Sequence, residues 1–83
     1  MEISTNAITS FILGKVAKLT KTDRETLHGD TLLADVGVDS LFAVLICGFI
    51  EDEYDLEVEP ILMFEYKTAN QVAQALLNMI EEK

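Results

Sequence analysis

LFAVLICGFI, residues 41 to 50, is a run of ten residues without a charged or strongly polar side chain. A helix that is apolar on nearly every side must be central in a small protein, because neighbours cover it from several directions. The preceding residues Gly37, Val38 and Asp39 read as a loop, since glycine tolerates positive φ and aspartate favours turns and helix caps. The stretch therefore predicts a central helix from Ser40 to about Tyr54.

Ser40 is placed by this prediction at the amino end of the central helix. The first backbone N–H groups of a helix have no partner within the helix. Such an end favours an attached anion, for example a phosphodiester. A serine at this point can also serve simply as a helix cap. The first interpretation predicts an exposed Ser40 hydroxyl, and the two remain alternatives.

Two further segments upstream of Ser40 show helix and loop signals. Ser4 or Thr5 can cap a first helix, whose apolar face then recurs at helical spacing. That face comprises Ile8, Phe11, Ile12, Val16 and Leu19. A long connection follows, from Thr20 to Val38. Its length predicts that apolar anchors hold it against the bundle, with a helical turn inside it. The expected anchors are Leu27, Leu32 and Leu33.

Downstream of the central helix, the sequence predicts a short third helix and a longer fourth one. Pro60 can be the first residue of the third helix, because a residue in the first turn needs no N–H, and this helix is expected to end at Tyr66. Val58 is expected to plug the core ahead of it. Thr68 and Gln71 fit a capping box for the fourth helix. Its core stripe is Val72, Leu76, Met79 and Ile80. The predicted fold is an all-α, four-helix bundle forming a single domain, residues 1–83.

The faces of the central helix can be assigned from their spacing. We expect the core side to comprise Val44, Ile46, Cys47, Phe49 and Ile50. Phe42 and Leu45 are then the best candidates for exposed apolar contacts beside Ser40. The alternative is that both are buried. On the short third helix, Met63 is expected to join the exposed face, and Phe64 to pack in the core.

Charge is distributed unevenly along the 83 residues. Acidic and basic residues cancel from Met1 to Ala34, so the segment from Asp35 onward carries all nine net negative charges. Nucleic acid is therefore an unsuitable partner, because phosphate binding needs the opposite sign. A basic patch on a protein partner is the natural complement and would raise the encounter rate. A solvated acidic face that maintains solubility is the alternative reading.

Length and composition also limit the class of protein. A single domain of this size has no room for both a core and a deep cleft, which argues against a self-sufficient enzyme. The longest apolar run is ten residues, whereas a membrane helix needs about 20. Met1 is followed by Glu2, so no signal peptide is visible. The single cysteine cannot form an internal disulfide, and we expect a cytoplasmic protein without a membrane partner.

Three segments together resemble the acyl carrier protein family. They are DVGVDSL at Asp35–Leu41, EDEYD at Glu51–Asp55 and FEYKT at Phe64–Thr68. The last is similar to the Phe-Glu-x-Pro-Thr segment common in polyketide and nonribosomal peptide carrier domains, with Lys67 in place of proline. The resemblance extends over roughly residues 8–80. Its pattern is most similar to discrete carriers of polyketide and nonribosomal peptide biosynthesis.

The resemblance implies that Ser40 is the attachment point for 4'-phosphopantetheine, which a phosphopantetheinyl transferase moves from coenzyme A. It implies a stand-alone acyl carrier, not an enzyme, that holds acyl intermediates as thioesters. Acyl-loading and condensing or tailoring enzymes of the polyketide type would act on it in trans, and we expect a monomer. This chemistry needs no base beside Ser40, so Asp39 is interpreted as a helix cap and a docking charge for the transferase.

The docking residues expected around Ser40 are Asp39, Leu41, Phe42, Leu45 and Met63. Many carriers of fatty acid synthesis have acidic residues where this chain has Phe42 and Leu45. The departure resembles carriers of polyketide or peptide assembly lines. A peptidyl (aminoacyl) carrier and a fatty acid carrier remain alternatives for the pathway. An unmodified acidic protein-binding adaptor is the alternative from a different class.

Other chemistries fit the sequence poorly. A Ser-His-Asp site would need Ser40 and His28, but no nucleophile-elbow glycines accompany the serine. The acidic run at residues 51–59 lacks the glycine and ligand spacing of a calcium loop. One cysteine and one histidine cannot form a structural zinc site. We therefore predict no metal site and no catalytic residue, and interpret Cys47 as a buried, unreactive thiol.

Overall fold

The computed structural model describes residues 3–82, and this part of the chain contains helices and no strand. The predicted all-α bundle is confirmed. It has four α-helices and two short 3₁₀ helices in the order α1 (Thr5–Thr20), η1 (Arg24–Thr26), η2 (Leu33–Val36), α2 (Ser40–Tyr54), α3 (Leu62–Glu65) and α4 (Ala69–Glu81). None of the described helices is long and apolar enough to cross a bilayer.

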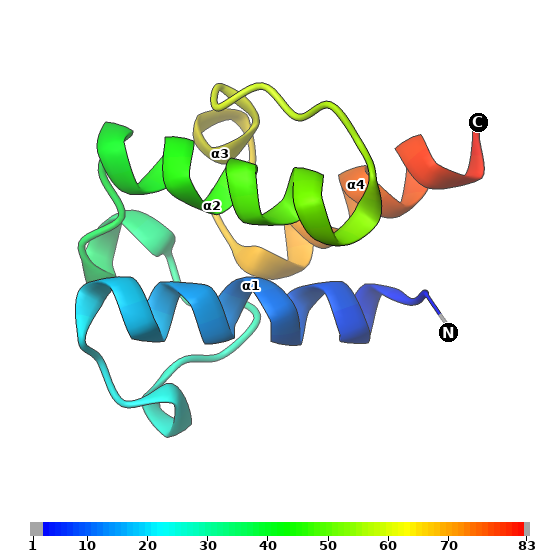
Figure 1. Cartoon of the computed structure of the whole chain (residues 1–83). Helices are drawn as coiled ribbons and strands as arrows, with labels where there is room; N and C mark the ends of the chain where they lie inside the picture. Colours follow the sequence, from blue (N-terminus) through cyan, green and yellow to red (C-terminus); the bar gives the residue numbers. More distant parts are fainter. Residues whose placement is uncertain (1–2, 83) are drawn as a thin grey trace.

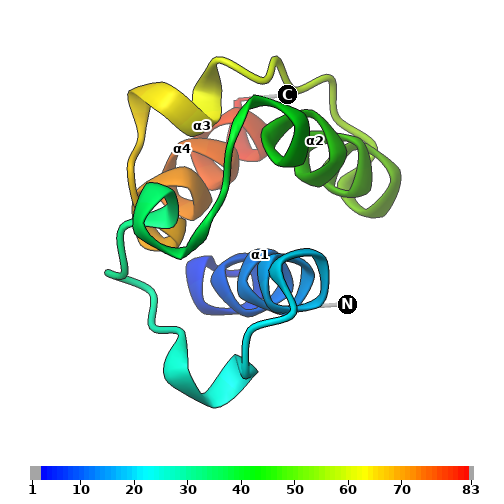
Figure 2. The same cartoon turned by 90° about the vertical axis from the view of Figure 1, so that its left-hand side faces the viewer.

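The long helices enclose a common interior. α1 packs against both α2 and α4. Figure 1 shows α1 and α2 running in opposite directions, and Figure 2 shows α1, α2 and α4 end-on around the interior. In both views α3 lies on the side of the bundle away from α1. The molecule is elongated along these helices, with extents of 33 × 23 × 20 Å.

The centre of the core is made by branched aliphatic side chains from the three long helices. Seven of these side chains are almost completely inaccessible: Ile8, Ile12, Val16, Ile46, Ile50, Val72 and Leu76. Burial of each stabilises the fold by about 1.5–3 kcal/mol. The predicted stripes of the first and fourth helices are confirmed at their centres, while Phe11, Leu19, Met79 and Ile80 are only partly buried at the edges.

Local side-chain chemistry fixes where the long helices begin. Ser4 caps α1 by accepting a hydrogen bond from the Ala7 amide at 3.1 Å. Thr68 caps α4 by accepting one from the Gln71 amide at 3.2 Å. The Gln71 side chain reaches back and accepts a hydrogen bond from the Lys67 amide at 2.9 Å. Half of the predicted capping box is therefore confirmed: Thr68 satisfies a first-turn amide of α4, whereas the Gln71 side chain binds the amide of Lys67, one residue before the cap, in place of the Thr68 amide.

The long connection between α1 and α2 is held in place, as predicted, and its helical turns are η1 and η2. Leu27 and Leu33 are buried anchors. Leu32 is 47% exposed, so the prediction that it anchors the connection is wrong. Its backbone forms an isolated antiparallel bridge with Thr68, and that pairing turns its side chain outward while Leu33 points inward. The Leu33 amide donates to the Lys67 carbonyl at 3.0 Å.

α3 is shorter than predicted and begins at Leu62, not at Pro60. Pro60 and Ile61 form the turn before it, and the Pro60 carbonyl accepts a hydrogen bond from the Met63 amide at 3.0 Å. The helix ends at Glu65 because Tyr66 is extended. Val58 is buried in the core ahead of α3, as predicted.

α2 has the predicted bounds, but two of its core assignments are wrong. Its buried stripe is Ala43, Ile46, Cys47 and Ile50. Val44 is 52% exposed and Phe49 lies at the surface with Lys15 Nζ 4.6 Å from its ring centroid. These two residues fall outside the stripe because core contact follows the i, i+3, i+4, i+7 spacing from Ala43.

Candidate functional site

Ser40 is the first residue of α2, and its side chain is exposed. Both features agree with the position predicted from the sequence. A hydroxyl at this point extends from a rigid helix into solvent, so a second protein can reach it. In Figure 1 this end of α2 lies at the left edge of the molecule, opposite the two chain termini.

Asp39 caps α2 immediately before Ser40. Its carboxylate oxygen Oδ1 accepts a hydrogen bond from the Phe42 amide at 3.0 Å, and its carbonyl accepts one from the Ala43 amide at 2.8 Å. Within residues 3–82, the amides of Ser40 and Leu41 have no hydrogen-bond partner. These two N–H groups form the positive end of the helix dipole beside the Ser40 hydroxyl.

The backbone before Ser40 is fixed by a turn and an anchor. Gly37 has φ 98°, a left-handed conformation that strains residues with a side chain. Val38 is buried, and its amide donates to the Leu33 carbonyl at 3.1 Å. Leu33 is in turn bonded to Lys67. Ser40 is therefore tied through backbone hydrogen bonds to the segment between α3 and α4.

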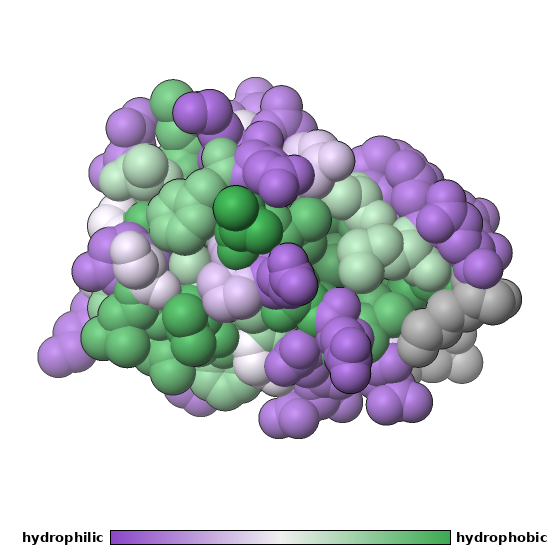
Figure 3. All heavy atoms as spheres, turned by 90° about the horizontal axis from the view of Figure 1, so that it is seen from above, coloured by the Kyte–Doolittle hydropathy of each residue, from purple (hydrophilic) through white to green (hydrophobic). Residues whose placement is uncertain are grey.

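Exposed apolar side chains surround the start of α2. Leu41 is 63% exposed, and Leu45 and Val44 are also exposed on the next turn. Phe42 is only half-buried and packs against the core, so the prediction of an exposed contact holds for Leu45 and only partly for Phe42. Figure 3 shows apolar side chains gathered on the side where α2 begins, and hydrophilic ones over its far end.

The prediction for α3 is reversed by the structure. Met63 is 5% exposed and belongs to the core, so its predicted role as a surface contact is wrong. Phe64, expected in the core, is 51% exposed. Four helical residues are too few to show a periodicity, so the sequence had no signal for the inward-facing side. Ile61 is a further exposed apolar residue that sequence reasoning missed; its only signal is its place beside Pro60 in a turn.

A hollow of about 210 Å³ lies between η2 and α3. It is lined by Leu32, Leu33, Ala34, Val38, Met63, Phe64 and Lys67. One of these lining residues, Val38, lies two residues before Ser40 in the sequence. The hollow is mainly apolar, so it can shelter an apolar group held near the start of α2.

Among residues 3–82, Ser40 lacks the hydrogen-bonded histidine that a Ser-His-Asp site requires. His28 lies exposed in the long connection, where its amide donates to Thr31 Oγ1 at 3.0 Å, and no hydrogen bond joins it to Ser40 among the described residues. Burial and then the negative charge of Glu51 raise the pKa of the Cys47 thiol to about 11. Cys47 is therefore a protonated core residue at neutral pH, as predicted. Residues 3–82 contain no cluster of His, Cys, Asp and Glu suited to a metal ion.

The chain matches a known family model over most of its length. The model for the phosphopantetheine attachment site matches residues 10–76. The chain is 39% identical over 57 residues to non-reducing polyketide synthase Dhc5 of Alternaria cinerariae, which covers 69% of this chain. It is 41% identical over 54 residues to non-reducing polyketide synthase terA of Aspergillus terreus, covering 64% of this chain. The matched region spans only 3% of the length of each synthase.

Two solved structures are similar to the whole bundle. One is a crystal structure of a free-standing peptidyl carrier protein from an uncharacterised secondary metabolic pathway of Acinetobacter baumannii, with a TM-score of 0.90 and 30% identity. The match covers 95% of this chain and 99% of that one. The other is an NMR structure of the HMG-ACPI domain of the CurA module from Lyngbya majuscula. Its TM-score is 0.87 at 17% identity, and the match covers 98% of this chain and 82% of that one. At this identity the likeness is one of fold.

Proposed function

The chain belongs to the family of carrier domains with a covalent phosphopantetheine attachment site, and on that premise we propose that Ser40 is the residue that bears the arm. The single observation that carries this proposal is the exposed Ser40 hydroxyl at the amino end of α2. The chain's other two serines lie near the start of the sequence: Ser4 caps α1, and Ser10 lies within it.

The residues around Ser40 suit a phosphodiester. The unpaired amides of Ser40 and Leu41 present positive dipole ends to an anion attached there. The helix end contributes about 0.3–1 kcal/mol to such an anion. The carboxylate of Asp39 opposes part of this gain, because it lies on the neighbouring residue. Its exposure to solvent screens this repulsion.

The bound arm supplies a thiol on which an acyl group is carried as a thioester. The chain's own residues present the attachment hydroxyl, hold α2 rigid behind it and offer a surface to partner enzymes. Within residues 3–82, neither His28 nor Cys47 is hydrogen-bonded to Ser40 as a general base or second nucleophile, and we propose that the domain itself is not an enzyme.

We propose that the cargo is an acyl intermediate of the polyketide type. The relatives named above include polyketide synthases up to 41% identical in the matched segment. An aminoacyl or peptidyl cargo is the second candidate, because the free-standing peptidyl carrier protein is 30% identical over nearly all of both chains. The likeness to that free-standing carrier protein supports the further proposal that this carrier is served by a phosphopantetheinyl transferase and by loading, condensing or tailoring enzymes that act in trans. We propose that the carrier works as a monomer.

The proposed docking surface comprises the cap residue Asp39, Leu41 and Leu45 on α2, and the exposed Phe64 on α3. Leu41 and Phe64 are each more than half exposed. These apolar contacts near Ser40 support polyketide or peptide partners, whereas the proposed surface offers few of the charged contacts expected of a fatty acid carrier. Phe42 contributes only the edge that its core packing leaves accessible.

The attachment proposal is tested by incubating the apo protein with coenzyme A and a broad-range phosphopantetheinyl transferase, followed by intact-mass measurement. We expect the wild-type protein to gain one phosphopantetheinyl group and Ser40→Ala to gain none. Ser10→Ala, which changes an exposed serine on α1, should gain the group normally. Modification of Ser40→Ala would overturn the proposal, and so would an unmodified wild-type protein beside an active control carrier.

The two cargo candidates are separated by a loading screen on the holo protein. Malonyl and other acyl donors are compared with amino acids and adenylating enzymes, and thioester formation is read by mass. We expect acyl loading. Exclusive aminoacyl loading would favour the peptidyl carrier and leave the attachment residue unaffected.

A further inference from the structure

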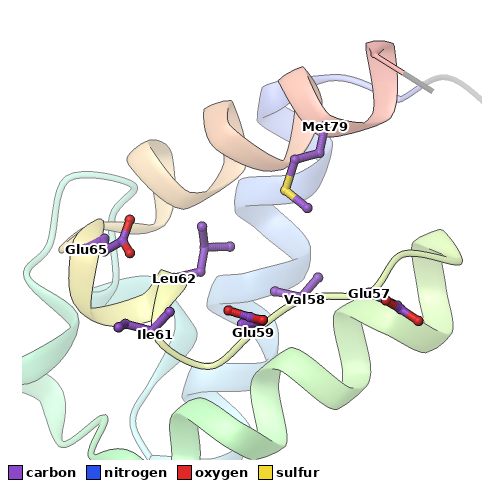
Figure 4. Close-up of a pocket in the computed structure, with 7 residues that line it drawn as sticks. All are labelled: Glu57, Val58, Glu59, Ile61, Leu62, Glu65 and Met79. Atoms are coloured by element: carbon purple, nitrogen blue, oxygen red, sulfur yellow. The ribbon is translucent and has the colours of Figure 1, made fainter.

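A second hollow lies between α4, α3 and the connection from α2 to α3. Its volume is about 350 Å³, near the lower end of about 300–1,000 Å³ typical of ligand sites. Figure 4 shows Val58, Leu62 and Met79 pointing into the same space, from the connection, α3 and α4 respectively. These side chains give the hollow an apolar floor.

A neighbouring hollow extends this space towards the end of α2. It is lined by Asp55, Leu56, Glu57 and Met79, so Glu57 and Met79 border both hollows. We call the two hollows together the distal groove. α2 contains 15 residues, which separates its two ends by about 22 Å at the usual rise per residue. The Asp55 end of the distal groove is therefore remote from the attachment serine.

The rim of the distal groove is acidic. Glu57, Glu59 and Glu65 border it, and no lysine or arginine is among the described residues that line either hollow. Within residues 3–82, these three carboxylates accept no hydrogen bond and form no ion pair. Glu51 differs, because its Oε2 accepts a hydrogen bond from the Val58 amide at 2.9 Å and so fixes the connection. The rim carboxylates are thus free to pair with cations from outside.

We propose that the distal groove is a second docking site, and that it takes a segment of a protein partner in which an apolar side chain is flanked by arginine or lysine. The apolar side chain fills the floor beside Leu62 and Met79, and the flanking cations pair with Glu57 and Glu59. Charge complementarity decides against a second copy of this chain, which would bring another nine net negative charges. Because the Asp55 end of the distal groove is remote from Ser40, a partner can hold the carrier there while the arm is used elsewhere.

The test uses ¹⁵N-labelled full-length protein carrying Ser40→Ala, so that its outcome is independent of the arm. The probe is a synthetic peptide with one leucine between two pairs of arginines. Two control peptides replace the leucine with alanine or the arginines with glutamates. We expect amide shifts confined to the distal groove, at Val58, Leu62 and Met79, with the leucine–arginine peptide binding more tightly than either control.

Two double variants with the same loss of charge show whether position matters. Glu57→Gln with Glu59→Gln should weaken binding about tenfold, the effect of two exposed charge pairs. Glu25→Gln with Asp30→Asn removes two exposed carboxylates outside the distal groove and should leave binding unchanged. Ile61→Ser, at an exposed residue of the wall, should also weaken binding without unfolding the bundle.

Four results would overturn the proposal. The first is amide shifts centred on the start of α2 or spread over all acidic residues. The second is equal weakening in the two double variants. The third is equal binding of the leucine and alanine peptides, which would show that charge alone attracts them. Shifts that depend on protein concentration without peptide would identify a second copy as the occupant and overturn it as well.

Discussion

Asp39 combines two roles that can be separated at the scale of a single residue. Its carboxylate oxygen caps α2 by accepting the Phe42 amide, and its charge lies next to the proposed attachment serine. We expect Asp39→Ala to lower the free energy of unfolding by about 1 kcal/mol, because the cap is lost. Asp39→Asn keeps a capping oxygen and should leave stability nearly unchanged. Urea unfolding measures both.

The docking role of Asp39 is tested with the same variants. If its charge guides the transferase, Asp39→Asn should be modified more slowly than wild type although its stability is preserved. Equal initial rates for Asp39→Asn and wild type, measured by intact mass, would show that Asp39 is a cap alone.

Cys47 gives the fold a pH dependence at alkaline pH. Burial and the charge of Glu51 raise its pKa from 9.0 to about 11. Between these values the folded protein keeps the proton that the unfolded chain releases, so the free energy of unfolding falls as pH rises. Urea unfolding at about pH 8 and about pH 10.5 measures this fall. Cys47→Ala should reduce this pH-dependent loss of stability. A smaller loss should remain, because the pKa of Tyr54 is also raised in the folded protein. An unchanged fall in Cys47→Ala would contradict the assignment.

At the scale of the element, α2 has a core face and a docking face. Ile46→Ala should destabilise the protein by about 2–5 kcal/mol, because Ile46 is fully buried. Leu41→Asp with Leu45→Glu should change stability by no more than about 0.5 kcal/mol per residue, because both side chains are exposed. The double variant should nevertheless be served poorly by condensing enzymes. A collapse in its melting temperature would show that these residues are core.

Helix starts could be predicted from the sequence because they depend on local chemistry. Each long helix begins after a residue whose side-chain oxygen accepts a hydrogen bond from a first-turn amide. These cap residues, Ser4, Asp39 and Thr68, can be recognised in the sequence by their side-chain type. The face of α2 could not be fully assigned, since a run such as LFAVLICGFI offers no polar residue to mark its outside. Val44 and Phe49 were misplaced for this reason.

Pairs of adjacent apolar residues in short elements were the other source of error. Leu32 and Leu33 both read as anchors, but the bridge between Leu32 and Thr68 turns only Leu33 inward. Met63 and Phe64 exchange their expected roles because α3 has only four residues. In the first pair the bridge to Thr68 decides which residue is buried, and in the second it is packing of Met63 in the core. Such contacts with distant parts of the chain cannot be read from the order of residues in a short segment.

One residue of α4, Asn70, is bonded both to the long connection and to α1. The Asn70 amide donates to the Gly29 carbonyl at 2.9 Å, and Asn70 Oδ1 accepts from Thr9 Oγ1 at 3.1 Å. A Cβ at residue 29 would collide with the Asn70 side-chain amide. We expect Gly29→Ala to cost about 0.5–1.5 kcal/mol, because the Asn70 side chain must turn away and lose its hydrogen bond with Thr9. Gly14→Ala, at an open position within α1, should stabilise by about 0.5–1 kcal/mol. Chemical denaturation distinguishes them, and equal effects would contradict this account of the tie.

At the scale of the whole molecule, charge and apolar surface are segregated. All nine net negative charges come from Asp35 onward, while exposed apolar side chains gather near the start of α2 (Figure 3). The acidic field can steer basic partners towards the molecule, and the apolar contacts near Ser40 can then determine which enzyme stays. This division suits a carrier that must meet several enzymes in turn.

The most direct test of the account is to locate the arm on the modified protein. Trypsin cleavage after Arg24 and Lys67 releases the peptide Glu25–Lys67, whose only serine is Ser40. After reaction with coenzyme A and a phosphopantetheinyl transferase, fragment-ion mass spectrometry should place one phosphopantetheinyl group on Ser40. A group found on Ser4, Ser10 or a threonine would contradict the account, as would an unmodified peptide beside a fully modified control carrier.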